Sequence, residues 1–248
     1  MVDEVEPWPR RRVQGPVTVL AHRGGAGPWR ENTLEAFAGA LRLGADGVEL
    51  DVRRTADGRL VVHHDAEIDG AGEVHALRAN ELPPWVPGLD EALETCGAAA
   101  VNVEVKNAPV EPGFDPAETV ATEVVSTLAA LSRTPGRGPA HVIVSSFWPA
   151  TLAAVHRAGP EVATGLLVHP SLDAAEAAER ALSIGCVALH PFHAQVTPAL
   201  VALAHGLGLG VATWTVNERH DVAAVAAAGV DVVISDRVTD ALEALGRG

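Results

Sequence analysis

The sequence predicts an α/β protein built as a closed (β/α)8 TIM barrel, and three observations lead to this fold class. Eight short apolar runs alternate along the chain with eight longer segments rich in alanine, leucine and glutamate. The apolar runs show little polar–apolar alternation, which is typical of parallel strands that are buried on both faces. The length of 248 residues matches a single barrel, which takes about 250 residues.

The predicted strands are rich in valine, isoleucine and leucine. In chain order they cover residues 17–22, 46–52, 100–106, 141–147, 162–168, 186–191, 210–216 and 230–236. The helices that follow them cover residues 33–43, 89–96, 116–132, 149–158, 173–183, 198–206, 218–228 and 239–246. Asn32 is expected to cap the first helix, because Glu35 follows three residues later as in a capping box. A doubly wound open sheet is the alternative fold, but the chain lacks the glycine-rich strand-to-helix turn of its nucleotide-binding type.

One segment departs from the alternation of strand and helix. The link RRTADG is too short for the crossover that a parallel strand needs. The run RLVVHH that follows it is therefore expected to return antiparallel, as a hairpin extension of the second strand with a two-residue Asp57-Gly58 turn. This register places Asp51 opposite His64 and turns His63 to the other face. A bulge in the turn would shift the register and bring His63 to the first face instead.

The chain is expected to form one domain over residues 1–248, with residues 1–14 as a flexible N-terminal arm. The segment AEIDGAGEVHALRANELPPWVPG after the hairpin is short and would form only a small cap. The N-terminal residues lack the apolar core of a signal peptide, and no run approaches the roughly 18 apolar residues of a membrane helix. We therefore expect a cytoplasmic protein with no membrane partner.

The formal net charge is −14, from 32 acidic and 18 basic side chains. This field repels nucleic acid and anionic lipid, so no nucleic-acid partner is expected. A phosphate-bearing substrate would need a local cation to hold it. Cys96 and Cys186 have neither zinc-ligand nor disulfide spacing and are expected to be buried thiols. The sequence carries no signal for the oligomeric state.

Three carboxylates stand near the ends of two neighbouring predicted strands. Glu49 and Asp51 alternate with valine and leucine in the second strand, and Glu104 lies in the third. The active site of this fold lies at the C-terminal ends of the strands, so these side chains should converge. Ligands that offer only oxygen suit hard cations. We predict one divalent cation, Mg²⁺, Ca²⁺ or Mn²⁺, on these three residues.

Two histidines flank the carboxylates. His22 ends the first strand and His64 ends the hairpin. Imidazole titrates near neutral pH, so the two side chains are suited to act as general acid and general base. His63 is expected to be structural because it points the other way.

Four further residues complete the predicted site. Arg23 and Lys106 are cations suited to phosphate oxygens, although either could instead pair with a carboxylate. Glu31 precedes the helix cap and is expected to support the site through a hydrogen bond. Trp214 ends the seventh strand and is expected to form an apolar wall for a small alcohol.

Several segments together resemble the glycerophosphodiester phosphodiesterase family. They are LAHRGGAGPWRENTLEAF, GADGVELDVRRTADGRLVVHHD, VNVEVK, VIVSSF, TWTVN and GVDVVISDRV, which run from about residue 17 to 240. The resemblance implies a barrel that cleaves a phosphodiester of glycerol to glycerol 3-phosphate and an alcohol. It also implies roles for individual residues: acid/base histidines at His22 and His64, metal ligands at Glu49, Asp51 and Glu104, phosphate-contacting cations at Arg23 and Lys106, and the ENT-motif glutamate at Glu31.

Two features depart from the family pattern. The segment after the hairpin lacks the arginine- and threonine-rich run and the longer insertion that family members commonly carry. His190 stands where an asparagine is common. The short segment leaves the identity of the leaving alcohol open.

The predicted reaction is a metal-dependent hydrolysis. The cation would bind a phosphoryl oxygen and the glycerol 2-hydroxyl, and it would lower the pKa of that hydroxyl. One histidine would accept the proton of the nucleophile, and the other would protonate the leaving alcohol. The resemblance implies that the 2-hydroxyl attacks first and gives a cyclic phosphate that water then opens. Direct attack by water is the alternative.

Three other functions fit parts of the pattern. A phospholipase-type lyase would stop at the cyclic product, but the acidic surface and the lack of an interfacial apolar segment disfavour a bilayer substrate. A non-catalytic barrel that binds glycerophosphodiesters could lose a histidine or a ligand, and this chain has kept all of them. A sugar-phosphate isomerase or lyase rests on the fold alone.

Overall fold

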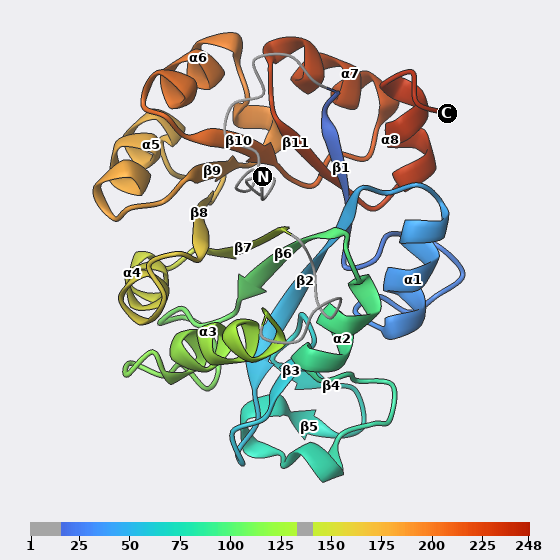
Figure 1. Ribbon diagram of the computed structural model, residues 1–248, viewed down its shortest axis with the longest axis vertical. Coiled ribbons are helices and arrows are strands. Elements are labelled where there is room, and N and C mark those ends of the chain that lie inside the picture. Colours follow the sequence, from blue (N-terminus) through green and yellow to red (C-terminus); the bar gives the residue numbers. More distant parts are fainter. Residues whose placement is uncertain (1–15, 133–140) are drawn as a thin grey trace, which may run out of the picture.

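The computed structural model describes residues 16–132 and 141–248. In Figure 1 the helices surround a central sheet, and the hairpin and cap lie at one end of the view. The N-terminal arm predicted for residues 1–14 lies outside the described residues.

The sheet closes into the predicted barrel. Its strands follow the order β1-β11-β10-β9-β8-β7-β6-β2, each paired in parallel with its neighbours, and β1 also pairs with β2. This closure excludes the open doubly wound sheet. The barrel strands are β1 (Thr18–His22), β2 (Gly47–Arg54), β6 (Ala100–Val105), β7 (His141–Ser146), β8 (Ala163–Val168), β9 (Ala188–Pro191), β10 (Gly210–Thr213) and β11 (Val232–Ser235).

An α-helix follows each barrel strand, after the hairpin and cap in the case of β2, and packs its apolar side against the outside of the sheet. The helices are α1 (Leu34–Arg42), α2 (Leu89–Cys96), α3 (Thr119–Ser132), α4 (Pro149–Ala158), α5 (Ala174–Ser183), α6 (Pro198–Gly206), α7 (Arg219–Ala228) and α8 (Val238–Ala244). The prediction that Asn32 caps the first helix was wrong, because Thr33 is the cap residue and its hydroxyl accepts from the N–H of Ala36. Asn32 has a left-handed φ of 55°, which directs its side chain to the active site instead.

The hairpin forms, but its register differs by one residue from the prediction. β3 (Leu60–Val62) pairs antiparallel with β2 and places Val62 opposite Val52. The predicted register would have placed His63 there. The ladder extends one hydrogen bond further, from the N–H of His63 to the carbonyl of Asp51 at 3.0 Å. Beyond this bond the chain bends away from the strand direction.

The turn explains the shift. Three residues, 56–58, close the hairpin instead of the predicted two. The N–H of Gly58 donates to the carbonyl of Thr55 at 3.0 Å, and Gly58 adopts a left-handed φ of 84°. A turn that ends in a left-handed glycine is the usual form of a three-residue hairpin loop. The Asp57-Gly58 pair therefore predicted the hairpin correctly, but the predicted loop was one residue too short.

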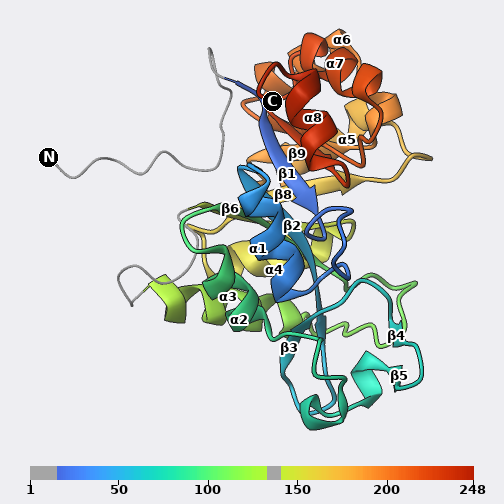
Figure 2. The ribbon, with the colours of Figure 1, turned by 90° about the vertical axis from the view of Figure 1, so that its right-hand side faces the viewer.

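A compact cap connects the hairpin to α2. It contains the two-stranded ribbon of β4 (Glu67–Ile68) and β5 (Gly72–Glu73), followed by two single 3₁₀ turns, η1 (Val74–Ala76) and η2 (Ala79–Glu81). The cap has a small apolar cluster of its own, with Val61, Ile68 and Val74 buried against Trp85. Figures 1 and 2 both place it beyond the carboxyl end of β2.

The barrel interior is charged near the C-terminal ends of β1, β2 and β6. Below this, toward the N-terminal ends of the strands, lies an apolar layer, which is called the lower level. The apolar level consists of Leu20, Ile143, Ala188, Ala212, Val232 and Ile234. Because alternate strand residues point inward, the interior residues that follow on β1 and β2 are polar. Gly47 at the lower level leaves room for β6, since a Cβ there would lie 2.0 Å from the carbonyl oxygen of Ala100.

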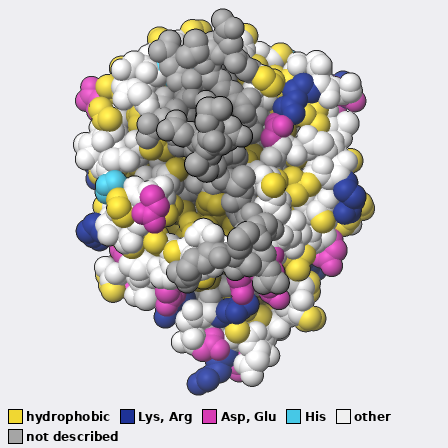
Figure 3. Space-filling view, viewed as in Figure 1, with side chains coloured by type: hydrophobic (Ala, Val, Ile, Leu, Met, Phe, Trp, Pro, Cys, Tyr) yellow, Lys and Arg dark blue, Asp and Glu magenta, His cyan; other side chains and the backbone are white. Residues whose placement is uncertain are grey.

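Cys96 and Cys186 are buried free thiols, as expected, and burial raises the pKa of Cys96 to about 12. No helix among the described residues is long and apolar enough to span a membrane. On the face shown in Figure 3, the acidic and basic side chains of the described residues lie interspersed.

Candidate active site

A cavity of about 130 Å³ opens at the carboxyl ends of the barrel strands. One side of it is polar and charged, and the other side is apolar. The polar side consists of His22, Arg23, Glu49, His64, Asn102, Glu104 and Lys106. The apolar side includes Phe147, Leu167, Trp214 and Ile234.

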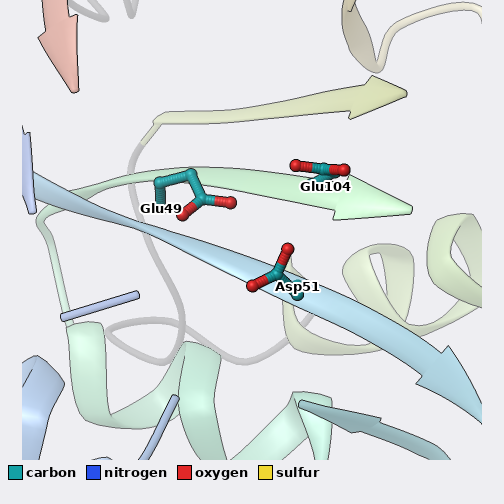
Figure 4. A group of neighbouring side chains, drawn as sticks. All are labelled: Glu49, Asp51 and Glu104. Carbon is teal, nitrogen blue, oxygen red and sulfur yellow. The ribbon is translucent and has the colours of Figure 1, made fainter. Parts of the chain in front are cut away.

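The three predicted metal ligands converge between β2 and β6 (Figure 4). The parallel register pairs Asp51 with Glu104, and Glu49 lies two residues earlier on the same face of β2. One carboxylate oxygen from each residue lies within 4.8 Å of the others. Glu49 and Asp51 are only 2% and 1% exposed, so the cluster sits in a medium where like charges repel strongly.

Lys106 partly neutralises this cluster. Its Nζ lies 2.6 Å from Oε1 of Glu104 and 3.2 Å from Oδ1 of Asp51, and it therefore links the two strands. It is the only lysine in the sequence, in which 17 of the 18 basic residues are arginines. Burial alone would lower the pKa of Lys106, but the two carboxylates outweigh it and raise that pKa.

Arg23 approaches the cluster from the turn after β1. Its Nε lies 3.4 Å from Oδ2 of Asp51, and its backbone N–H donates to Oε2 of Glu49 at 3.1 Å. Its Nη1 donates to Glu31 at 3.0 Å. Glu31 is largely exposed and reaches the cluster only through this arginine. Asn32 donates its amide to Oδ2 of Asp51 at 2.8 Å.

The partners are shared unequally among the three carboxylates. Burial would raise the pKa of Asp51, but the charges of Lys106, His64 and Arg23, together with the Asn32 hydrogen bond, hold that pKa below its usual value. Burial and the charge of Asp51 raise the pKa of Glu49 to about 8. Burial likewise raises the pKa of Glu104.

The donor set fits a divalent cation. Three carboxylates face two cationic side chains, and Oε1 of Glu49 is buried with no hydrogen-bond partner among the described residues. A buried oxygen of this kind is costly unless a hydrogen bond or a metal satisfies it. Since the ligands are oxygen atoms alone, they suit Mg²⁺, Ca²⁺ or Mn²⁺.

His22 is held at the mouth of the barrel by a carboxylate that the sequence analysis missed. Its Nδ1 lies 2.7 Å from Oδ1 of Asp236, and the Nδ2 group of Asn217 donates to the other oxygen of Asp236 at 2.7 Å. Its Nε2 lies 3.9 Å from Oε2 of Glu49. Burial would lower the pKa of His22, but Asp236 and Glu49 outweigh it and raise that pKa.

His64 lines the cavity, and His63 does not. The Nδ1 of His64 lies 2.7 Å from Oδ1 of Asp65, a second carboxylate that the sequence analysis missed. Burial and the charge of Lys106 lower the pKa of His64, because the opposing effects of Asp51 and Asp65 are smaller. The ring of His63 instead packs against Trp85, with their centroids 5.8 Å apart.

The apolar wall is built from aromatic edges. The ring centroid of Trp214 lies 5.4 Å from that of Phe147 and 5.6 Å from that of Phe192, with both pairs edge to face. Its indole N–H donates to the carbonyl of His190 at 2.8 Å, so the ring is fixed from both sides. The polar tip of Trp214 is thus satisfied inside the barrel, which leaves an apolar surface toward the cavity.

Comparisons with known proteins identify the family. The model of the Glycerophosphoryl diester phosphodiesterase family matches residues 22–240. The chain belongs to this family. A glycerophosphodiester phosphodiesterase of Caldanaerobacter subterraneus is 33% identical over 239 residues, covering 88% of this chain and 93% of the relative. One from Bacillus altitudinis is 29% identical and covers 88% and 94%.

Solved structures agree with this family assignment. The glycerophosphodiester phosphodiesterase of Thermotoga maritima has a TM-score of 0.73 and 26% identity, and covers 91% of this chain and 97% of that one. A phosphodiesterase of Oleispira antarctica in complex with the product sn-glycerol-3-phosphate has a TM-score of 0.78 and 25% identity, and covers 93% and 97%. The predicted fold, family and enzyme class are confirmed.

Proposed function

We propose that this family member hydrolyses glycerophosphodiesters to glycerol 3-phosphate and an alcohol, and that it requires one divalent cation. The support is the converging set of Glu49, Asp51 and Glu104 beside two histidines in one cavity. The product-bound relative from Oleispira antarctica supports the substrate class. The single observation that carries the cation is the buried, unpartnered Oε1 of Glu49 within a cluster that has fewer cations than carboxylates.

The three carboxylates would hold the cation, and Lys106 and Arg23 would keep them in place. A bound divalent cation supplies charge that stabilises a phosphoryl group and acidifies a hydroxyl group. Lys106 and Arg23 already pair with carboxylates, so they contact a phosphate oxygen only by sharing their donors. Their fixed positions would orient the phosphate against the two histidines.

His22 and His64 would exchange the protons. Both rings line the cavity, and each is oriented through Nδ1 by a carboxylate, Asp236 or Asp65. A ring held in this way presents Nε2 for proton transfer. One histidine would accept the proton of the attacking hydroxyl, and the other would protonate the leaving alcohol. Trp214 and its neighbours would form the apolar wall against the substrate.

The nucleophile in this proposal is the glycerol 2-hydroxyl, and water opens the resulting cyclic phosphate. A lyase would use the same residues and stop at the cyclic product. A product-identified assay over several glycerophosphodiesters separates the two, with chelated protein and with Mg²⁺, Ca²⁺ and Mn²⁺ in turn. We expect cation-dependent release of glycerol 3-phosphate. Full activity in chelator would contradict the cation, and accumulation of the cyclic phosphate alone would identify a lyase.

A further inference from the structure

His64 stands where the barrel no longer holds the backbone. β3 ends at Val62, and the last ladder bond is donated by the N–H of His63. The side-chain partner of His64 is Asp65, whose carboxylate is 74% exposed and adjacent in sequence. An exposed neighbour of this kind fixes a ring weakly, because water competes for the same hydrogen bonds. The position of His64 therefore depends on another contact.

Arg53 supplies that contact. Its Nε and Nη2 both donate to the carbonyl oxygen of His64, at 2.8 Å and 2.6 Å. Its Nη2 also donates to Oε2 of Glu111, in the loop after β6, at 2.8 Å. The Arg53 side chain is only 8% exposed, and its planar fork has little freedom once three hydrogen bonds hold it. A buried guanidinium is stable only when paired in this way.

We propose that Arg53, held by Glu111, is a positioning residue that fixes the peptide carrying His64 in the active site. The inference rests on the proposed role of His64 in proton transfer. Arg53 is absent from the residues that line the catalytic cavity, so it acts through His64 and not on the substrate. A displacement of about 1 Å at a catalytic group can cost up to about 10²-fold in rate. His22 needs no such support because it lies on β1 itself.

The chain offers a matched control in the next residue. Arg54 also extends from the end of β2, and it forms its own two-point ion pair with Glu123 at 2.7 Å and 3.0 Å. Neither bond involves His64. Loss of Arg54 therefore reports the cost of removing an arginine ion pair at this position, without the contact to the His64 carbonyl.

The kinetic test compares Arg53→Met, Arg53→Lys and Arg54→Met in the full-length protein. We expect Arg53→Met to lower kcat about 10–10²-fold and to change KM less than about threefold. The substitution should displace the His64 ring and leave the substrate-binding contacts in place. Arg53→Lys restores one donor and should recover part of the loss. Arg54→Met should stay within about twofold of wild type. Equal losses in Arg53→Met and Arg54→Met would overturn the inference, and so would an unchanged kcat in Arg53→Met.

A spectroscopic test is independent of turnover. With histidine labelled for NMR, the His64 ring signal is identified among the 11 histidines by its loss in His64→Ala. We expect this signal to shift or broaden in Arg53→Met and to stay unchanged in Arg54→Met. If the wild-type protein fails to hydrolyse the substrate, the proposed function is wrong, yet this measurement still decides the positioning role. An unchanged His64 signal in Arg53→Met would refute that role.

A milder variant covers the case in which Arg53→Met does not fold. Glu111→Gln keeps the guanidinium and removes only its carboxylate partner. We expect about a threefold loss of kcat together with a smaller change in the His64 signal. Wild-type values of both quantities in Glu111→Gln would contradict the account.

Discussion

The two sides of the cavity are built on different strands and follow different physical rules. The ends of β1, β2 and β6, with the hairpin, form what we call the charged side. It consists of the cavity-lining residues His22, Glu49, His64, Glu104 and Lys106, together with Asp51, which completes the carboxylate cluster. The ends of β7, β8, β10 and β11 form what we call the apolar side: Phe147, Leu167, Trp214 and Ile234. Buried ionisable groups lie on the charged side. On the apolar side, aromatic rings pack edge to face beside aliphatic side chains.

The difference separates chemistry from stability. On the charged side, desolvation raises the pKa of Glu49 to about 8 and leaves one of its oxygens without a partner. Such an arrangement lowers the stability of the cation-free protein and is retained where activity requires it. On the apolar side, every aromatic contact contributes to packing. Mutations on the charged side should therefore reduce activity more than stability, and those on the apolar side should do the reverse.

The largest effect is expected for loss of a carboxylate on the charged side. Glu104→Ala should lower kcat/KM by at least about 10³-fold, since it removes a proposed cation ligand and a partner of Lys106. The fold should survive, because the substitution also relieves like-charge repulsion. Glu123→Ala, which removes only the ion pair with Arg54 on the outside of the barrel, is the control and should stay within about twofold. The two variants are compared by steady-state kinetics with and without added cation. Near-normal activity of Glu104→Ala in chelator would contradict the ligand assignment.

The two histidines should rank next. His22→Ala and His64→Ala should each lose at least about 10²-fold in kcat, the lower edge of what a positioned proton-transfer group contributes. Both should still bind the cation, because neither is among the proposed ligands. A diester with a leaving alcohol of low pKa should rescue only the variant that lost the acid.

His63→Ala is the matched control for this pair, because its ring lies outside the cavity against Trp85. Its kcat should stay near the wild-type value. Near-normal rates in both His22→Ala and His64→Ala would contradict the acid/base assignment, and loss of cation binding in either would make that histidine a ligand.

A buried histidine on β9, which lines neither side of the cavity, predicts a pH dependence of stability. His190 is fully buried, neither ring nitrogen has a hydrogen-bond partner within the part of the chain that the structure describes, and burial lowers its pKa to about 3. The folded ring stays neutral above that pH, whereas the unfolded ring takes up a proton below about 6.5. Stability contributed at neutral pH is therefore lost as pH falls, by about 2 kcal/mol at pH 5.

The His190→Asn variant isolates the contribution of His190 protonation to the free energy of unfolding, because asparagine does not titrate. We expect the free energy of unfolding, measured with urea at pH 7 and pH 5, to fall less in His190→Asn than in wild type. The carboxylates titrate in both proteins and cancel in the difference. An identical pH dependence in the two proteins would show that His190 is solvated or partnered in solution.

The smallest effect on rate is expected at the aromatic wall. Trp214→Leu should raise KM about 3–10-fold and change kcat less than about threefold, because the ring contributes apolar contact and not proton transfer. Phe192→Leu touches Trp214 without lining the cavity and serves as the control. A kcat loss in Trp214→Leu as large as in the histidine variants would break the division between the two sides.

The sequence predicted the charged side better than the features that hold it in place. Alternation along a buried strand put Glu49 and Asp51 on one face, and the end of a neighbouring strand added Glu104, so the cluster followed from local pattern. Asp236 directly follows β11 and could have been found by the same rule. Asn32 could not, because its contact with Asp51 depends on a left-handed backbone that asparagine adopts only in some contexts.

The hairpin shows the same limit. The sequence signal for the turn was correct, but a two- and a three-residue loop carry the same Asp57-Gly58 pair, and the choice shifts the register by one residue. His64 still reaches the cavity, because the chain leaves the strand direction after Val62. The Arg53 contact to a backbone carbonyl left no pattern in the sequence, since every residue offers that acceptor.

The central claim is that Glu49, Asp51 and Glu104 bind one divalent cation, and the sole lysine of the chain makes a direct test possible. In chelator-stripped protein labelled at lysine, the single ammonium signal belongs to Lys106, and titration with Mg²⁺, Ca²⁺ or Mn²⁺ should shift or broaden it with a stoichiometry of one. Burial and the charge of Asp51 raise the pKa of Glu49 in the cation-free protein, so a cation that binds there should displace a proton. Calorimetry in buffers of different ionisation heat should therefore detect release of up to one proton. Glu49→Gln should weaken binding and abolish the proton release. An unmoved Lys106 signal at millimolar concentrations of all three cations, in a protein that hydrolyses its substrate fully in chelator, would contradict the account.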